Sequence, residues 1–373
     1  MRKYYQLSLS FVLLTLFFSS TVYGQALRLP ENNNFVCSSG RKIGVTDIEI
    51  KWNAPGVKGR EGKIWGTDVA YFGYAVLGYG SNVESPWRAG ADECTTISVS
   101  TDVKINGKTL PAGKYALFML LTEDSTTLIF NKNTAAWGSY FYRKDLDVMR
   151  VSTRQKKNQP NLIERLTYQY SNQTENSIDV SLDWERWSIP FKIEVDLKKT
   201  TLAYLQREMS GAIGFDPASL EAAAAWCLSH ETNYEEALNW INSASDPALG
   251  GLKNFRTLSI KSKLLDKVGR KEEATTIIQT AIENASALEL NSYGRQLLME
   301  KKITEAMAVY EKNYQKHKGA WPTNAGMMNG YSAVGNLKKA LEHAKLALAQ
   351  APNEQIKKFL EKAVKTLEEG KPL

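Results

Sequence analysis

The sequence predicts an α+β protein with the two kinds of structure in separate domains, an antiparallel β-sandwich or barrel followed by an array of α-helical repeats. The first observation is that apolar and polar residues alternate in short runs along residues 41–198, as in half-buried strands. The second is that apolar residues recur every third or fourth position along residues 199–373, as in amphipathic helices. The third is that similar residues return in this second part at intervals of 32 to 37 positions, as in a helical repeat.

The composition is that of a folded protein and does not predict a nucleic-acid partner. Of the 373 residues, 43% are hydrophobic and 23% are charged, which is typical of soluble globular domains. The formal net charge is +7, from 47 basic and 40 acidic side chains, and without Arg2 and Lys3 it is 45 − 40 = +5. An excess of this size over so long a chain is too small to indicate nucleic-acid binding.

The first 24 residues have the three parts of a secretory signal peptide. Arg2 and Lys3 precede an apolar run at residues 7–18, and small and polar residues follow up to Gly24. We therefore expect cleavage after Gly24, a loose leader at residues 25–40, and a periplasmic or secreted protein. The alternative is an uncleaved N-terminal anchor. No later segment has the about 18 apolar residues of a transmembrane helix, so none is predicted.

Residues 41–198 are predicted to form the all-β domain. Ile48, Ile50 and Trp52 alternate with charged residues, as in a strand with one buried face. Asn106-Gly107 tolerates positive φ and predicts a tight hairpin turn. Further runs of strand character lie at residues 95–103, 115–121, 126–131, 148–153, 166–170, 178–184 and 189–195. Many short strands separated by turns are typical of an antiparallel sandwich or barrel.

A glycine-rich and aromatic segment at residues 57–90 interrupts these strands. It contains several glycines interspersed with aromatic residues, Trp65 and Trp87 among them. A long irregular segment of this kind is either a functional loop or a cover over one end of the β domain. The sequence leaves both interpretations open.

Residues 199–373 are predicted to form the helical array, in which Asp216-Pro217 starts a helix as N-cap and first helical residue. Four helices begin with a similar phrase that ends in a small residue, followed four positions later by a second packing residue. The small residues are Ala237, Ala274, Ala306 and Ala340. This pattern resembles the tetratricopeptide repeat, in which a small residue lets two paired helices approach closely. The resemblance implies a curved surface whose groove receives a protein or peptide partner.

Several phrases of the β domain occur in an order and at spacings that match those of a known family. They are Gly44-Val45-Thr46-Asp47, Pro55-Gly56-Val57-Lys58-Gly59-Arg60, Ile64-Trp65-Gly66, Trp87-Arg88-Ala89-Gly90-Ala91-Asp92-Glu93, Asn106-Gly107-Lys108, Leu110-Pro111-Ala112-Gly113-Lys114-Tyr115, Asn131-Lys132-Asn133 and Trp137-Gly138. Over residues 41–195 they resemble the domain-of-unknown-function 2911 family, found chiefly in exported proteins of Bacteroidota-type bacteria. The resemblance implies a β-rich exported domain, sometimes joined to tetratricopeptide-like repeats, and it implies no reaction. The segment between Trp65 and Trp87 is longer and more aromatic than the usual family pattern.

The sequence predicts no catalytic residue, no cofactor and no metal site. The three histidines, His230, His317 and His343, lie in the helical half, so the β domain lacks the commonest general base and metal ligand. His230 is expected at a helix end, and His317 and His343 on the surface. The motifs HExxH, GxSxG and the phosphate-binding P-loop do not occur.

The three cysteines have different expected roles. Cys37 and Cys94 fall in the β part of an exported chain and are candidates for a disulfide. The sequence does not fix whether they pair. Cys227 lies in an alanine-rich helix and is expected as a small core residue.

The residues predicted to bind a ligand are polar and aromatic side chains on loops of the β domain. They are Trp87, Arg88, Asp92, Asn131 and Trp137. For Arg88 the alternative is an ion pair that ties its loop to the sheet. For the tryptophans it is packing in the sandwich core.

We therefore expect an exported binding or scaffold protein. The β domain would contact a ligand, such as a glycan or an envelope component, and the repeats would hold a protein partner. The alternative is a hydrolase of glycans or peptides that uses Asp92 and Glu93 beside Arg88. Adjacent residues of an extended segment point to opposite faces, which argues against Asp92 and Glu93 acting as a facing pair.

Overall fold

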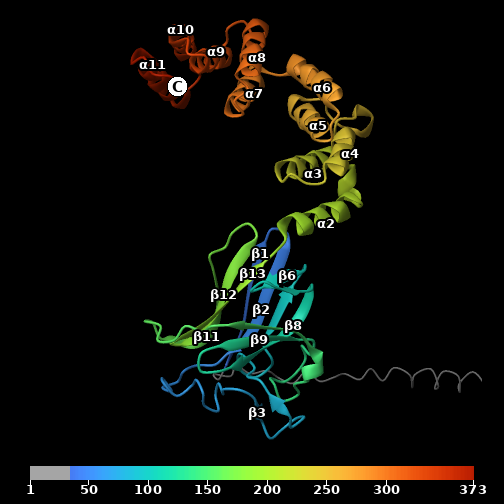
Figure 1. The fold of residues 1–373 in the computed structure, drawn as a ribbon, viewed down its shortest axis with the longest axis vertical. Coiled ribbons are helices and arrows are strands. Elements are labelled where there is room, and N and C mark those ends of the chain that lie inside the picture. The colour runs from blue at the N-terminus through green and yellow to red at the C-terminus, as the bar shows by residue number, and fades with distance from the viewer. Residues whose placement is uncertain (1–33) are drawn as a thin grey trace, which may run out of the picture. The chain divides into compact units, whose positions relative to one another are not determined.

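The computed structural model describes residues 34–373. The predicted signal peptide and most of the predicted leader lie outside these residues. The described chain divides into two compact units, a β unit that ends at Val195 and a helical unit, Asp196–Leu373 (Figure 1). This confirms the predicted order of a β-rich part followed by helices.

The β unit is built on two antiparallel sheets. The larger sheet has the strand order β1-β2-β5-β8-β9-β10, with β1 Phe35–Ile43, β2 Thr46–Ala54, β5 Thr96–Val99, β8 Gly113–Leu121, β9 Thr126–Asn131 and β10 Asp147–Thr153. The second has the order β11-β12-β13-β6-β7, with β11 Ile163–Ser171, β12 Ser177–Glu185, β13 Trp187–Glu194, β6 Val103–Ile105 and β7 Lys108–Leu110. The short strands β3 Ala75–Val76 and β4 Glu84–Ser85 form a hairpin in the glycine-rich segment, and a 3-10 helix, η1, spans Lys144–Leu146.

The two sheets enclose one hydrophobic core, which confirms the predicted sandwich. Every second residue of β12 points into it, from Ile178 to Trp184, and the alternate residues of β2 and β8 face them from the other sheet. Full burial of such side chains contributes about 1.5–3 kcal/mol each to the free energy of folding. The period-two pattern of the sequence is therefore the cause of the layered arrangement.

Three local expectations can be compared with the strands. Asn106 and Gly107 have φ values of 45° and 82° and form the turn between β6 and β7, which confirms the predicted hairpin. Residues 35–40, assigned to a leader from the sequence, belong instead to β1, the edge strand of the larger sheet. The single predicted strand at residues 95–103 is wrong, because β5 and β6 lie in different sheets and the chain crosses between them at residues 100–102.

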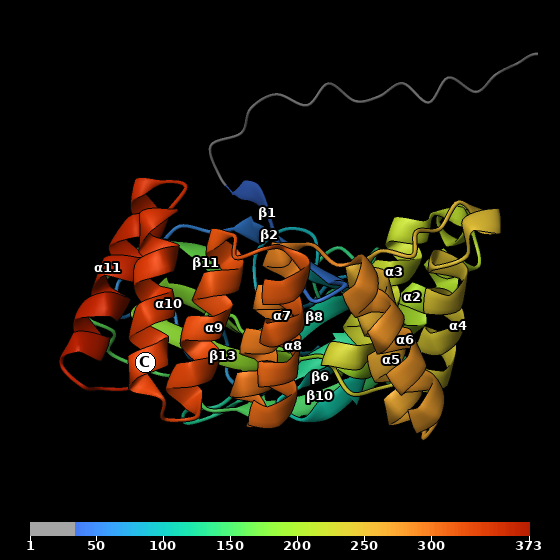
Figure 2. The same cartoon turned by 90° about the horizontal axis from the view of Figure 1, so that it is seen from above.

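The helical unit starts at α2 and continues to α11 in successive antiparallel pairs (Figure 2). The helices are α2 Leu197–Met209, α3 Pro217–Ser229, α4 Tyr234–Ala244, α5 Phe255–Lys267, α6 Lys271–Asn284, α7 Ala287–Met299, α8 Ile303–Lys316, α9 Trp321–Ala333, α10 Leu337–Ala349 and α11 Glu354–Glu368. Two 3-10 helices, η2 Ala212–Phe215 and η3 Pro247–Leu249, lie between them. Asp216 caps α3 by accepting a hydrogen bond from the Ser219 amide, as predicted. Within residues 34–373, no helix has the length and apolarity required to cross a bilayer.

The repeated alanines form the contacts between paired helices. Ala237, Ala274, Ala306 and Ala340 lie near the starts of α4, α6, α8 and α10, and all four are buried. Gly269 and Gly335, with positive φ, make the turns that end α5 and α9. The alanines therefore allow the paired helices to approach closely, and the glycines allow the turn between them, as in a tetratricopeptide repeat.

Tyr310 of α8 is the largest fully buried side chain of the helical unit. Its ring packs against Gly294 of α7 and against Gly326 of α9, where an added Cβ atom would meet the ring within 2.6 Å. The three helices approach closely because these two positions have no side chain. The Tyr310 ring thereby fixes how α7, α8 and α9 pack.

His343 of α10 is half-buried, so the prediction that it lies on the surface is wrong. Its ring stacks on Tyr331 and meets Tyr314 edge-on, and its Nδ1 is 2.9 Å from Oδ1 of Asn324. Burial lowers the pKa of His343 below its ordinary value of 6.5, with nearby Glu342 opposing the shift and Lys339 adding to it.

We predict that acid selectively weakens the helical unit through His343. A folded-state pKa below that of the unfolded chain means that the unfolded state binds the proton first as pH falls through about 6.5. Stability should therefore be lost progressively below that pH. Thermal unfolding followed by far-UV circular dichroism should show a larger fall in midpoint on acidification for the natural protein than for His343→Gln. Equal falls in the two proteins would contradict this role of His343.

Candidate functional site

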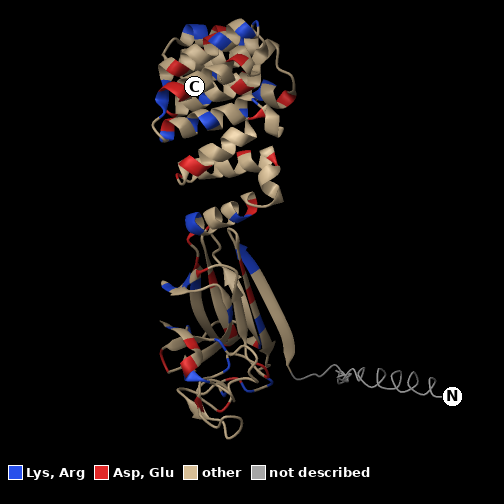
Figure 3. Cartoon of the chain, turned by 90° about the vertical axis from the view of Figure 1, so that its right-hand side faces the viewer, with Lys and Arg blue, Asp and Glu red and all other residues tan. Residues whose placement is uncertain are grey.

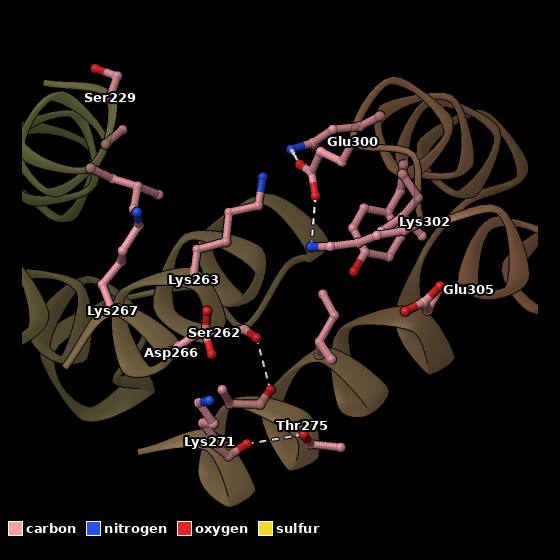
Figure 4. Close-up of a pocket in the computed structure, with 17 residues that line it drawn as sticks. Ser229, Ser262, Lys263, Asp266, Lys267, Lys271, Thr275, Glu300, Lys302 and Glu305 are labelled. Carbon is pink, nitrogen blue, oxygen red and sulfur yellow. Dashed lines mark hydrogen bonds and ion pairs between the residues drawn. The ribbon is translucent and has the colours of Figure 1, made fainter. Parts of the chain in front are cut away.

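The helical unit contains a groove of about 940 Å³ between helices α3, α5, α6 and α7 and the start of α8 (Figure 4). Its floor is apolar and includes the buried residues Ala274 and Leu297. Ser262 on α5 is also buried and donates a 2.8 Å hydrogen bond to the carbonyl oxygen of Ala274, which fixes α5 against α6. The floor is thus rigid, and the polar groups that can meet a ligand stand on the walls.

Three of the charged side chains that line the groove, Lys302, Glu300 and Lys267, have an ion-pair partner. Lys302 lies 2.8 Å from Glu300, which also accepts a 2.8 Å hydrogen bond from Gln296. The hydrogen bond between them raises the pKa of Lys302 and lowers that of Glu300. Lys267 lies 3.7 Å from Glu231. These side chains therefore contribute little net field inside the groove.

Among the lining charges without an ion-pair partner in the described residues, Asp266, Lys271 and Glu305 are exposed, and Lys263 on α5 is the partly buried one. It is half-buried, and it makes no hydrogen bond or ion pair with any residue that the structure describes. Its amino group points into the open space of the groove (Figure 4). Burial lowers the pKa of Lys263, and the attraction of Glu300 opposes this shift. An ammonium group held in this way is stabilised by any anion that enters the groove.

The charge of the helical unit as a whole does not explain the site. Basic and acidic residues are mixed over its helices (Figure 3). What distinguishes the groove is the position of a partly buried cation, Lys263, above an apolar floor. Such a combination of apolar lining and a few polar groups is typical of binding sites.

Of the ligand-binding residues predicted in the β unit, Trp87 belongs to the core. It is 2% exposed, stacks on Trp184 and meets Trp65 edge-on. Trp65 in turn stacks on Trp187. The glycine-rich segment therefore covers one end of the sandwich with these aromatic rings, and Trp87 is not available to a ligand.

Arg88 and Asp92 lie together, but Arg88 forms no ion pair with a residue that the structure describes, so the alternative of an ion pair that ties its loop to the sheet is wrong. The Arg88 guanidinium donates a 3.0 Å hydrogen bond to the backbone oxygen of Asp92 and lies over the Tyr140 ring. The Asp92 carboxylate accepts from Asn34, and the Glu93 carboxylate accepts from Asn53. Because each carboxylate is held by a different asparagine, the arrangement favours a structural role for both over the hydrolase alternative.

Asn131 and Trp137 have opposite environments. Asn131 is fully buried, donates to the Arg143 oxygen and to Asp147, and accepts from the Asn133 amide. It therefore holds a loop in place and cannot contact a ligand. Trp137, on that loop, is 53% exposed and is the one predicted binding residue that presents a large apolar surface.

Trp137 is one of three exposed aromatic residues on two loops that contact each other through Tyr140. The loop between β3 and β4 contributes Tyr79, whose ring meets Tyr140 edge-on, and the Ser81 amide bonds to the Tyr140 oxygen. Tyr79, Trp137 and Phe141 are all exposed. We call these three residues the aromatic surface of the β unit. Of these three residues, only Trp137 was among the binding residues predicted from the sequence.

A polar network lies under the same loop and was not predicted from the sequence. Arg150 donates to Asp147 at 2.6 and 2.8 Å, to Tyr74 at 2.7 Å and to Tyr142 at 2.7 Å. Tyr142 donates to Asp147, and burial and this carboxylate raise the pKa of Tyr142. The network ties Tyr74 of the glycine-rich segment to β10.

All three cysteines are free, so Cys37 and Cys94, the candidates for a disulfide, are not paired in this structure. Cys37 packs against the core between the two sheets, whereas Cys94 belongs to a separate cluster with Phe118 and Ile129. The residues next to Phe118 in β8 and next to Ile129 in β9 point to the opposite face of the larger sheet, into the main core. The larger sheet therefore separates the two thiols. Cys227 is buried in the helical core, as predicted. Across residues 34–373, no three His, Cys, Asp or Glu side chains gather in a metal-binding arrangement.

Comparison with known families confirms the resemblance of the β unit. Residues 37–193 match the model of the family described as "Protein of unknown function (DUF2911)". No curated protein matches the chain.

Two solved structures of MamA are similar to part of this chain. One is MamA 41-end from Desulfovibrio magneticus RS-1, which is 20% identical over 41% of this chain and 90% of that chain, with a TM-score of 0.26. The other is the MamA RS-1 ArsTM double mutant, which is 17% identical over 42% of this chain and 96% of that chain, with a TM-score of 0.25. At this level the similarity says nothing about ligands or partners. The tetratricopeptide-like arrangement is visible in the paired helices themselves.

Proposed function

We propose that this protein binds an extended segment of a partner protein in the groove of its helical unit. The observation that supports this most strongly is the half-buried Lys263, which has an apolar floor below it and no hydrogen-bond or ion-pair partner among the described residues. The groove is lined by residues of α3, α5 and α7, the first helices of three neighbouring pairs. An extended chain can follow such a path and place side chains alternately toward the floor and toward solvent.

The group that Lys263 would bind is a carboxylate of that segment. A charge-assisted hydrogen bond to a carboxylate satisfies a buried ammonium group and is roughly twice as strong as a neutral one. We therefore propose an acidic side chain within the partner segment as the anchor.

We predict that Lys263→Met weakens the binding of acidic peptides by about tenfold, because a hydrogen bond to a charged group contributes about 1.5–3 kcal/mol. The measurement is fluorescence polarisation with short serine- and glycine-rich peptides that carry one glutamate. The matched control is Lys338→Met, which removes an exposed lysine of α10 outside the groove. Equal affinity of the two variants, or equal binding of peptides with glutamine in place of glutamate, would contradict the proposed anchor.

We further propose that the β unit contacts a second ligand through its aromatic surface. The support is that Tyr79, Trp137 and Phe141 are exposed on loops held together by backbone and side-chain hydrogen bonds. Exposed rings on rigid loops can stack on a sugar ring or pack on an envelope component. Together the two sites make the protein a scaffold that joins a ligand to a protein partner.

We also propose that this scaffold is exported. The support is the charged and apolar pattern of residues 1–24, which is that of a cleavable signal peptide. N-terminal sequencing of the protein from its natural host should start at Gln25. A start at Met1 or Arg2 would contradict cleavage.

A further inference from the structure

A second cavity, of about 490 Å³, lies on the helical unit between α7, α9 and α11. Its lining is mainly apolar and includes Met299, which is 78% exposed, and Phe359, which is 54% exposed. Arg295 stands beside them and makes no hydrogen bond or ion pair within the described part of the chain. Large apolar side chains with this degree of exposure are favourable contacts for another apolar group.

Helix α7 is the wall that the groove and this second cavity share. Tyr293, Gln296 and Glu300 line the groove, whereas Ser292, Arg295 and Met299 line the second cavity. Successive residues of an α-helix are rotated by about 100°, so these two sets lie on opposite sides of one exposed face. The other face of α7, with Leu290 and Gly294, is buried. A segment in the groove can therefore continue over α7 into the second cavity.

We propose that the partner segment is bipartite, with an acidic residue that binds Lys263 and a bulky apolar residue that enters the cavity of Met299 and Phe359. This inference rests on the proposed function of the groove. The unpaired Arg295 adds a second cation next to the apolar cavity, so acidic residues near the apolar one are also favoured.

The width of α7 sets the separation of the two residues. An α-helix with its side chains is about 10 Å across, and an extended chain advances about 3.3 Å per residue. A segment that crosses α7 therefore needs about three or four residues between the acidic and the apolar side chain. This spacing distinguishes one continuous segment from two independent contacts.

The test uses the full mature chain and a series of serine- and glycine-rich peptides that carry one glutamate and one leucine at increasing separations. Fluorescence polarisation should show the highest affinity at a separation of about three or four residues, with a gain of about tenfold over glutamate alone. Phe359→Ser should remove the gain from leucine and keep the binding of the peptide with glutamate alone. Because Phe359 is exposed, this variant should fold normally.

The outcomes separate this inference from the proposed function. If glutamate-dependent binding is lost in Lys263→Met but leucine adds nothing, or adds the same at every separation, the groove is a binding site and the bipartite segment is wrong. A leucine gain that survives Phe359→Ser likewise overturns the inference. If no peptide binds the natural protein, the proposed function and this inference both fail.

Discussion

Replacing Gly294 with valine is expected to destabilise the helical unit by about 3 kcal/mol. The added side chain would overlap the ring of Tyr310, which is fully buried and has Gly326 on its other side. The ring cannot move away from one helix without meeting the other. Extra atoms in a close-packed core force off-rotamer side chains or backbone shifts.

Urea unfolding followed by far-UV circular dichroism measures this effect, because the helices dominate that signal. The matched control is Ser292→Val, which places the same side chain at an exposed position of the same helix. The control should change the free energy of unfolding by less than about 0.5 kcal/mol. Similar values for the two variants would show that Tyr310 and Gly294 are not packed as described.

Asp147→Asn is expected to destabilise the β unit by about 3 kcal/mol. The Asp147 side chain is 9% exposed, and it accepts hydrogen bonds from Arg150, Tyr142 and Asn131. Removing its charge leaves the Arg150 guanidinium partly buried beside two tyrosine hydroxyls that cannot replace the carboxylate. The loop that carries Trp137 and the glycine-rich segment with Tyr74 should loosen together.

A neighbouring pair provides the control for this prediction. Arg143 and Asp145 form an ion pair of similar geometry, but both side chains are more than half exposed. Asp145→Asn should therefore have a much smaller effect than Asp147→Asn, because solvent screens an exposed ion pair. Tryptophan fluorescence during urea unfolding reports mainly on the β unit, which contains six of the nine tryptophans. If Asp145→Asn were the more damaging of the two, the buried network would not have the role described.

The main elements of both units could be predicted because burial imposes a period on the sequence. Strand β12 and the helices that carry the repeated alanines show that period clearly. Strand β1 was missed at residues 35–40 because an edge strand has a neighbour on one side only, and most of its side chains are exposed. Where burial is weak, the sequence pattern is weak as well.

The sites were harder to predict because they depend on distant residues. Lys263 differs from the other lysines of the helical unit only in what surrounds it, and those surroundings come from α6 and α7. Arg150 receives Tyr74 from a segment 76 positions earlier in the chain. Cys37 and Cys94 were expected as a possible pair, but the sequence does not show on which side of a sheet each thiol lies. The only feature of the nearby sequence that marks Lys263 is Lys267, which lies four residues later on the same face of the helix.

Site-specific photo-cross-linking in the natural host tests the central claim most directly. A photoreactive residue at Thr275, which lies in the groove, should link to a partner polypeptide, and one at Lys338, outside the groove, should not. Introducing Lys263→Glu should abolish the Thr275 link, because it places a negative charge where a carboxylate is proposed to bind. A Thr275 link that persists in Lys263→Glu, or equal links from both positions, would contradict the groove as the binding site.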